Sequence, residues 1–146
     1  MHNEDIICQT VEDLVSIREV KGLHAIVEHR GAVSRYSCDQ LEELLRASAM
    51  AAGATVIGSN FHDFGDGVGN TGVLVLAESH ISVHTWPENN YAAIDIFFCG
   101  NDDHNGLEPV EAAIDVLRSA DKHGCFHSKI LCRRLPDKDQ STEGNH

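Results

Sequence analysis

The segment at residues 81–86 constrains the fold of this chain more than any other. It reads Ile-Ser-Val-His-Thr-Trp, so Ile81, Val83 and Thr85 alternate with polar or amphipathic side chains. A β-strand points successive side chains to opposite faces, and the segment therefore has one largely apolar face and one face that carries most of its polar groups. Residues 91–99 repeat the alternation. Two such strands require a sheet with one face packed against a hydrophobic layer.

Two segments with helical spacing can supply that layer. Ser37 and Gln40 form a capping-box pattern at the start of the first segment, and Gly53 follows as a stop signal. Pro109 suits the first turn of the second segment, and Gly124 is expected to end it. The apolar stripes of the two helices consist of Leu41, Leu44, Leu45 and Ala49, and of Val110, Ala113, Ile114 and Leu117.

The remaining strands complete the order β-α-β-β-β-β-α-β. They are expected at residues 23–28, 54–59, 73–77 and 126–135. Residues 63–72 hold four glycines and are expected to form a loop. Packing both helices on one face of the sheet buries every apolar stripe. The sequence therefore predicts an α+β fold, a two-layer α/β sandwich with a mainly antiparallel sheet and the helices on one face.

The length of 146 residues favours one domain. We expect that domain at residues 21–136, after an N-terminal extension at residues 1–20 and before a polar, disordered tail at residues 137–146. Four apolar residues within positions 11–17 of the extension are spaced as in a short helix.

Composition excludes several classes of partner. The 23 acidic and 11 basic residues give a net charge of −12, which argues against binding to nucleic acid or to an anionic membrane. No apolar stretch is long enough to span a bilayer. The five cysteines form no CxxC pair, and no secretory signal precedes them, so we expect reduced thiols and a cytoplasmic protein.

The ten histidines raise the question of a metal site. No Cys/His set has zinc-finger spacing. His80 and His84 share a face of the predicted strand, but four residues of strand place them roughly 13 Å apart, too far for one ion. We therefore expect no metal.

A polar cluster lies between two predicted strands at Glu78-Ser79, with His84 five residues beyond the serine. Such a cluster is unusual there unless the serine takes part in chemistry. The run from Leu76 to Glu88, Leu-Ala-Glu-Ser-His-Ile-Ser-Val-His-Thr-Trp-Pro-Glu, closely resembles the self-cleavage site of the pyruvoyl-dependent S-adenosylmethionine decarboxylases. The resemblance implies that the chain breaks between Glu78 and Ser79, and that Ser79 becomes a covalently bound pyruvoyl cofactor.

The steps of such a cleavage assign roles to nearby residues. The Ser79 hydroxyl attacks the preceding carbonyl to give an ester, and a base then removes the serine α-proton so that elimination expels the upstream chain. We expect His84 to supply the base and Thr71 a hydroxyl that steadies the ester. The pyruvoyl ketone condenses with the substrate α-amine as a Schiff base and accepts the electron pair released with CO2. Cys99 is expected to return a proton to the substrate α-carbon.

The resemblance is strongest over residues 54–100 and extends through residues 22–28. It includes the Phe-His-Asp-Phe run at residues 61–64, in which Phe64 resembles an aromatic residue that stacks on the substrate's adenine. Phe64 and Glu28 are the predicted substrate-binding residues. The family further implies a two-layer sandwich and a homodimer of cleaved αβ protomers.

Two departures from the family pattern touch the substrate-facing side. The glycine-rich loop at residues 65–72 is one residue longer than the usual form and lacks its proline, and His29-Arg30 replaces an aromatic residue after Glu28. The predicted function is decarboxylation of S-adenosylmethionine for spermidine synthesis. A pyruvoyl-dependent arginine or ornithine decarboxylase is the alternative, and an unprocessed homologue that acts as a regulatory subunit is a third.

Overall fold

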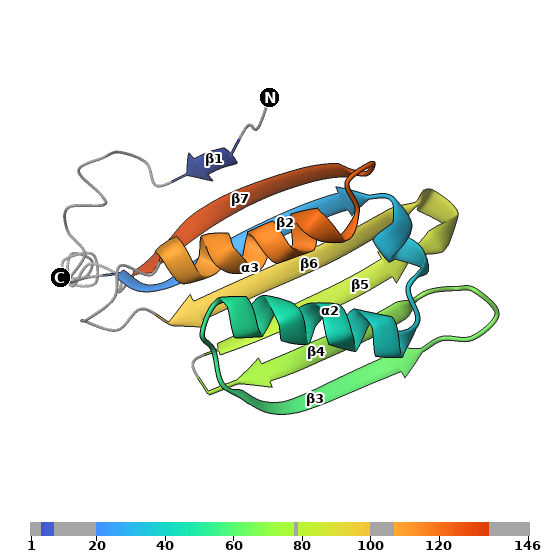
Figure 1. The fold of residues 1–146 in the computed structure, drawn as a ribbon, viewed down its shortest axis with the longest axis horizontal. Helices are drawn as coiled ribbons and strands as arrows, with labels where there is room; N and C mark the ends of the chain where they lie inside the picture. Colours follow the sequence, from blue (N-terminus) through green and yellow to red (C-terminus); the bar gives the residue numbers. More distant parts are fainter. Residues whose placement is uncertain (1–3, 8–19, 78, 100–106, 135–146) are drawn as a thin grey trace, which may run out of the picture.

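The structure, a computed structural model, describes residues 4–7, 20–77, 79–99 and 107–134 (Figure 1). These residues form one seven-stranded sheet in the order β1-β7-β2-β6-β5-β4-β3. Neighbouring strands run antiparallel except β1 and β7, which are parallel. The strands are β1 (Glu4–Ile7), β2 (Val20–Arg30), β3 (Val56–Asp63), β4 (Asn70–Leu76), β5 (Ser79–Trp86), β6 (Tyr91–Cys99) and β7 (Cys125–Arg134).

Two α-helices lie on the same face of this sheet (Figure 1). They are α2 (Cys38–Ala51), which contacts β3, β4 and β5, and α3 (Leu107–Ala120), which contacts β2. Short 3-10 helices, η2 (Ala32–Arg35) and η3 (Pro87–Asn89), connect the elements. The predicted apolar stripes of both helices are buried, and so are Ile81, Val83 and Thr85 of β5. The prediction of a mainly antiparallel α+β sandwich is therefore confirmed.

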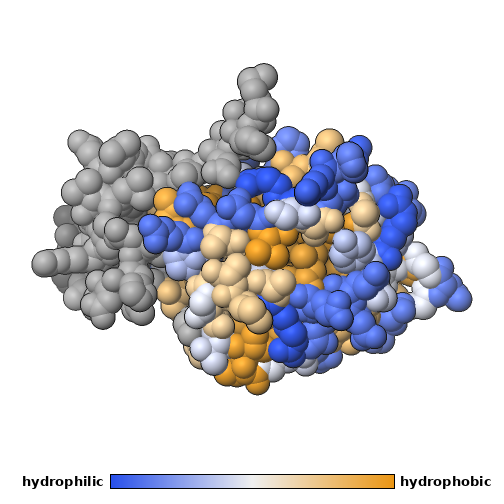
Figure 2. Space-filling view, in the orientation of Figure 1, coloured by the Kyte–Doolittle hydropathy of each residue, from blue (hydrophilic) through white to orange (hydrophobic). Residues whose placement is uncertain are grey.

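Figure 2 shows the helix-covered side of the molecule, where apolar side chains gather between the two helices and over β3. Ile57 of β3 is 65% exposed, and Met50 near the end of α2 is 78% exposed. No helix in the described part of the chain is long and apolar enough to cross a membrane.

The opposite side of the sheet, which we call the open face, carries no helix among the described residues. It is formed by every second residue of each strand, the set that alternates with the buried one. From β2, β6 and β5 it presents His24, Glu28 and Arg30, then Tyr91, Asp95, Phe97 and Cys99, and finally His80, Ser82, His84 and Trp86.

Local signals set the ends of the helices. Gln40 donates its backbone N–H to Ser37 Oγ at 3.2 Å, and Ser37 donates its own to Gln40 Oε1 at 3.0 Å, which confirms the predicted capping box. Helix α3 ends at Ala120, before the predicted stop at Gly124. The reason is Asp121, whose carboxylate accepts the backbone N–H groups of His123 and Gly124 and so forms a turn in place of another helical turn.

Three further features differ from the sequence prediction. Residues 4–7 of the extension form β1, a strand that no alternation pattern had indicated. β3 continues to Asp63 and β4 begins at Asn70, so the glycine-rich loop is shorter than expected. Three described cysteines carry free thiols, but Cys132 is disulfide-bonded, so the expectation of reduced thiols is wrong at that position. The helix predicted at residues 11–17 and the tail at residues 137–146 lie outside the described residues.

Candidate active site

Ser79 is the first residue of β5, immediately after the short connection from β4. Ala77 anchors that connection by donating its backbone N–H to the Thr55 carbonyl at 2.8 Å. The Ser79 Oγ atom is buried, and it has no hydrogen-bond partner among the described residues. Buried hydroxyls are normally hydrogen-bonded, so an unsatisfied one marks a position that needs a chemical explanation. Glu78, the other half of the predicted cleavage site, lies outside the described residues.

Cys99 lies at the same end of the sheet as Ser79. Ser79 pairs with Phe98 of β6, and Cys99 follows Phe98 directly as the last residue of that strand. Its side chain is an exposed free thiol on the open face. The predicted cleavage serine and the predicted proton donor therefore lie at the same end of the sheet, one residue apart in the β5–β6 register.

Thr71 and His84 form a second polar pair on the open face. They are register partners in β4 and β5, and Thr71 Oγ1 lies 2.8 Å from His84 Nδ1. Five residues of extended strand separate His84 from Ser79, which corresponds to roughly 16 Å. The structure thus joins His84 to Thr71 but, within one chain, does not bring His84 to Ser79.

Between these two ends, a cluster of rings occupies the open face. His24 Nε2 lies 3.0 Å from Asp95 Oδ1. The rings of His24 and His80 contact Phe97 from either side, with centroids 6.1 and 5.7 Å away. The Arg133 guanidinium lies over the Phe97 ring, 5.4 Å from its centroid. The sequence analysis missed this cluster, although the alternation of β6 already places Asp95 and Phe97 on the same face.

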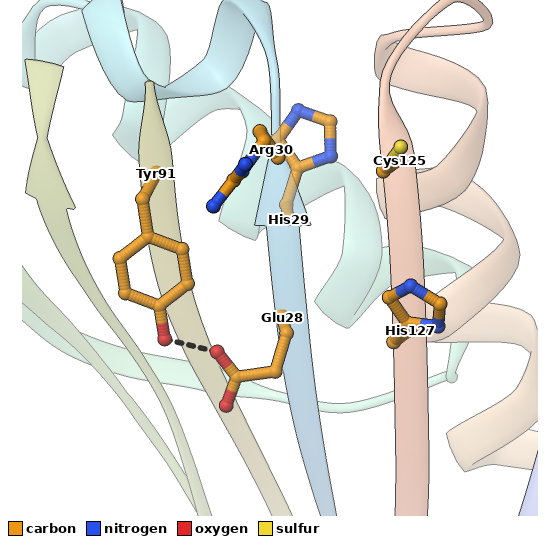
Figure 3. Close-up of a pocket in the computed structure, with 6 residues that line it drawn as sticks. All are labelled: Glu28, His29, Arg30, Tyr91, Cys125 and His127. Atoms are coloured by element: carbon orange, nitrogen blue, oxygen red, sulfur yellow. Dashed lines mark hydrogen bonds between the residues drawn. The ribbon is translucent and has the colours of Figure 1, made fainter. Parts of the chain in front are cut away.

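A pocket of about 300 Å³ is formed by residues of β2, β6 and β7. Glu28 of β2 and His84 of β5 are the register partners of the same residue, Ala93, from its two sides. Figure 3 shows Tyr91 pointing to Glu28, and the Tyr91 hydroxyl donates a hydrogen bond to Glu28 Oε2. The pocket is lined by Glu28, His29, Arg30, Tyr91, Cys125 and His127.

The contact with Glu28 determines the protonation state of Tyr91. The hydrogen bond to the Glu28 carboxylate, aided by burial, raises the pKa of Tyr91 to about 12, so the phenol stays protonated. Trp86 stacks on the Tyr91 ring, with centroids 5.3 Å apart. The Tyr91 hydroxyl thus engages one oxygen of the Glu28 side chain.

His29, one of the residues that line the pocket, is buried and pairs with Asp121. His29 is 2% exposed, and its Nε2 atom lies 3.3 Å from Asp121 Oδ2. Burial lowers the pKa of His29, and the Asp121 charge opposes this only in part. The Ala32 backbone N–H, at 2.8 Å, is the main reason that the pKa of Asp121 is lowered.

Phe64 lies on the other side of the Thr71–His84 pair from the pocket. It is 57% exposed in the glycine-rich loop, and its ring meets that of His62 edge to face at 4.8 Å. His62 is the register partner of Thr71. Among the described residues, no group of three or more His, Cys, Asp or Glu side chains is arranged to hold a metal ion.

The fold and these residues together define an α+β protein of the enzyme type. The polar side chains of its sheet gather on the open face. The family described as S-adenosylmethionine decarboxylase matches residues 23–128 of the chain. An S-adenosylmethionine decarboxylase proenzyme of Thermosipho africanus is 40% identical over 117 residues, covering 73% of this chain and 82% of that protein. A proenzyme of the same name from Methanococcus maripaludis is 49% identical over 81 residues, covering 54% of this chain and 66% of that protein.

A solved structure agrees with the sequence matches. The crystal structure of the adenosylmethionine decarboxylase from Aquifex aeolicus superimposes with a TM-score of 0.67 at 28% sequence identity, and the match covers 88% of this chain and 99% of that one. The chain belongs to the S-adenosylmethionine decarboxylase family. It is accordingly an enzyme of the carboxy-lyase class.

Proposed function

We propose that the chain is a proenzyme that cleaves itself between Glu78 and Ser79 and then decarboxylates S-adenosylmethionine. The observation that carries the proposal is the Ser79 hydroxyl at the start of β5, which is buried and has no partner among the described residues, at the same end of the sheet as Cys99. Relatives that match this chain are named as proenzymes, which agrees with a processing step. The product would serve spermidine biosynthesis in the cytoplasm.

Cleavage begins when Ser79 Oγ attacks the carbonyl carbon of Glu78 and the amide becomes an ester. A base then removes the α-proton of Ser79, the Cβ–O bond breaks, and the upstream chain leaves as the Glu78 carboxylate. Residue 79 is left as dehydroalanine, which takes up water and releases ammonia to give a pyruvoyl group. Each step uses only the chain and water.

The base is His84 of a second copy of the chain. Roughly 16 Å of strand separates His84 from Ser79 in one chain, which is too far for proton transfer. Val75 and Trp86 are each 40% exposed on the open face, so this face offers apolar surface to a second copy. A two-fold contact between open faces can bring the Thr71–His84 end of one chain to the Ser79 end of the other.

The residues around Ser79 fit the pyruvoyl group. The buried Ser79 hydroxyl, unsatisfied among the described residues, supports this position for the group, and Cys99 follows the register partner of Ser79 in β6. When present, the group supplies an electron-withdrawing carbonyl that stabilises the charge left by CO2. The exposed Cys99 thiol then returns a proton to the substrate α-carbon.

S-adenosylmethionine is the substrate that the exposed Phe64 ring favours, because a planar adenine can stack on it. One observation supports arginine or ornithine as the alternative substrate. Glu28 lines the pocket, and an acidic side chain there suits the distal cation of those amino acids. Arg30 lines the same pocket and opposes that reading, since it repels a second cation.

Mass spectrometry of the reduced, denatured protein tests the cleavage. We expect fragments of 78 and 68 residues (146 minus 78), the smaller one blocked at its N-terminus, and no cleavage in Ser79→Ala. A single intact chain after long incubation of folded protein would contradict the proposal. Measuring CO2 released from S-adenosylmethionine, arginine and ornithine in separate reactions decides the substrate.

A further inference from the structure

Thr71 and His84 form the last register pair of the β4–β5 ladder. The pairs run from Val75 and His80 to Thr71 and His84, and none is formed beyond them by Asn70 and Thr85. A terminal pair of a ladder frays unless something holds it, because its opening exposes few buried contacts. The pair on which the proposed base depends thus lies at one end of the β4–β5 ladder.

A side chain continues the ladder where the backbone pairing stops. The Thr85 hydroxyl accepts a hydrogen bond from the Asn70 backbone N–H at 2.9 Å. It also donates one to the Asn70 carbonyl oxygen at 3.4 Å. Thr85 is 4% exposed, so water does not compete for these contacts. One buried hydroxyl therefore replaces the backbone hydrogen bonds that would otherwise pair Asn70 with Thr85, next to Thr71 and His84.

Asn70 ties the same point to another element. Its side-chain Nδ2 donates to the Tyr36 carbonyl at 2.9 Å, just before α2, and Asn70 is 8% exposed. The close approach needs Gly69, since a Cβ there would lie 2.2 Å from the Thr85 carbonyl oxygen. Asn70 and Thr85 thus connect the start of β4, the end of β5 and the entry to α2.

We propose that Asn70 and Thr85 form a clamp that holds Thr71 against His84, which makes them positioning residues for self-cleavage. The proposal rests on the proposed function, because the Thr71–His84 pair matters only if it acts in processing. Neither residue lies on the open face beside the reacting groups, so both act through their neighbours. A valine would fit the buried position of Thr85 in β5 equally well. The Thr85 hydroxyl is therefore the group that serves the clamp.

Two variants remove the clamp with little change of shape, namely Thr85→Val and Asn70→Leu. Val33→Ala is the matched control, because it removes buried apolar volume from η2, close to Tyr36, without touching the clamp. Each protein is followed by its rate of self-cleavage, by the ester that hydroxylamine traps, and by its thermal midpoint. Amide hydrogen exchange is measured in parallel in a Ser79→Ala background, where no cleavage intervenes.

Loss of the clamp should slow cleavage about tenfold, which corresponds to one buried hydrogen bond, and the trapped ester should accumulate. Amide exchange at residues 70–72 and 83–85 should rise by about the same factor, while exchange near Leu74 and Ile81 stays unchanged. Val33→Ala should lower the thermal midpoint and still cleave at the wild-type rate well below it.

Each other outcome overturns part of the inference. Unchanged exchange in Thr85→Val and Asn70→Leu would show that no clamp exists. Faster exchange with wild-type cleavage would show that the clamp holds the pair but does not serve processing. If wild-type protein itself fails to cleave, the proposed function is wrong, and the exchange measurement alone still decides whether the clamp holds the pair.

Discussion

At the scale of single residues, His84 and His80 offer a direct comparison. Both lie on the open face of β5, four residues apart, and only His84 contacts Thr71. His84→Ala should stall at the ester, because elimination lacks its base, and hydroxylamine should then cut the chain. His80→Ala, the matched control, should process normally. Hydroxylamine fragments on a denaturing gel report the difference, and equal processing of both variants would exclude His84 as the base.

Phe64 tests the substrate at the same scale. Stacking of an adenine on its exposed ring would contribute about 0.5–1.5 kcal/mol. Phe64→Ala should therefore raise KM for S-adenosylmethionine by up to roughly tenfold, with little effect on processing. Val68→Ala is the control, because Val68 is equally exposed in the same loop, at 58%. A KM that stays constant in Phe64→Ala would remove the main support for a nucleoside substrate.

His29 should make stability depend on pH. Burial places the pKa of His29 in the folded protein below its ordinary value of 6.5. As pH falls below about 6.5, the unfolded chain takes up a proton that the folded protein does not, so the free energy of unfolding falls. The lowered pKa of Asp121 keeps its carboxylate charged until the pH falls below about 3.8, outside this window.

Urea unfolding at pH 7.5 and pH 5 measures this effect. The wild type should lose stability between the two values, and His29→Phe should lose less. His123→Gln, at an exposed histidine, is the control and should match the wild type. An equal loss in His29→Phe and the wild type would show that the buried pair is not the cause.

At the scale of elements, the start of α2 depends on its cap. Ser37→Ala removes the hydroxyl that accepts the Gln40 backbone N–H, which should cost about 1 kcal/mol of unfolding free energy. Ser119→Ala, at an exposed position of α3, should be neutral or slightly stabilising because alanine favours helix. Urea midpoints of the two variants give the comparison, and equal midpoints would show that the capping box contributes nothing.

The same elements show what a sequence can predict. Alternation identified β5 and β6, and capping and apolar spacing identified α2 and α3, because these signals act over a few neighbouring residues. β1 was missed because the strand it pairs with, β7, lies more than a hundred residues away along the chain. The early end of α3 at Ala120 was missed because a side chain, Asp121, and not the glycine, forms the turn.

For the site, the sequence singled out Thr71 and His84 but placed Thr71 in the glycine-rich loop, and their contact depends on the register of β4 against β5. It did not reveal that Ser79 and Cys99 share one end of the sheet, since that depends on the register of β5 against β6. The separation of Ser79 and His84 could have been predicted from the sequence. The same rise per strand residue that places His80 far from His84 also places Ser79 far from it.

At the scale of the whole molecule, the proposed homodimer makes a prediction that one chain cannot meet. Ser79→Ala lacks the nucleophile and His84→Ala lacks the base, so neither should cleave alone. When the two are co-expressed, the Ser79→Ala chain can supply His84 to its partner, and the His84→Ala chain should be cut. Mass spectrometry distinguishes the two chains. Absence of cleavage in a verified mixed dimer would place the base within the same chain.

The strand order has a consequence for the life of the processed protein. Residues before the proposed cut form β1 to β4, and residues after it form β5 to β7, yet four of the six neighbouring pairs in the sheet join one group to the other. The two fragments are interleaved, so they cannot separate without loss of the sheet. An intact precursor refolds as a single molecule at any dilution. After the cut, refolding would require the two fragments to associate again. The native state of the cut protein would therefore persist because unfolding is slow, and not because the protein can refold.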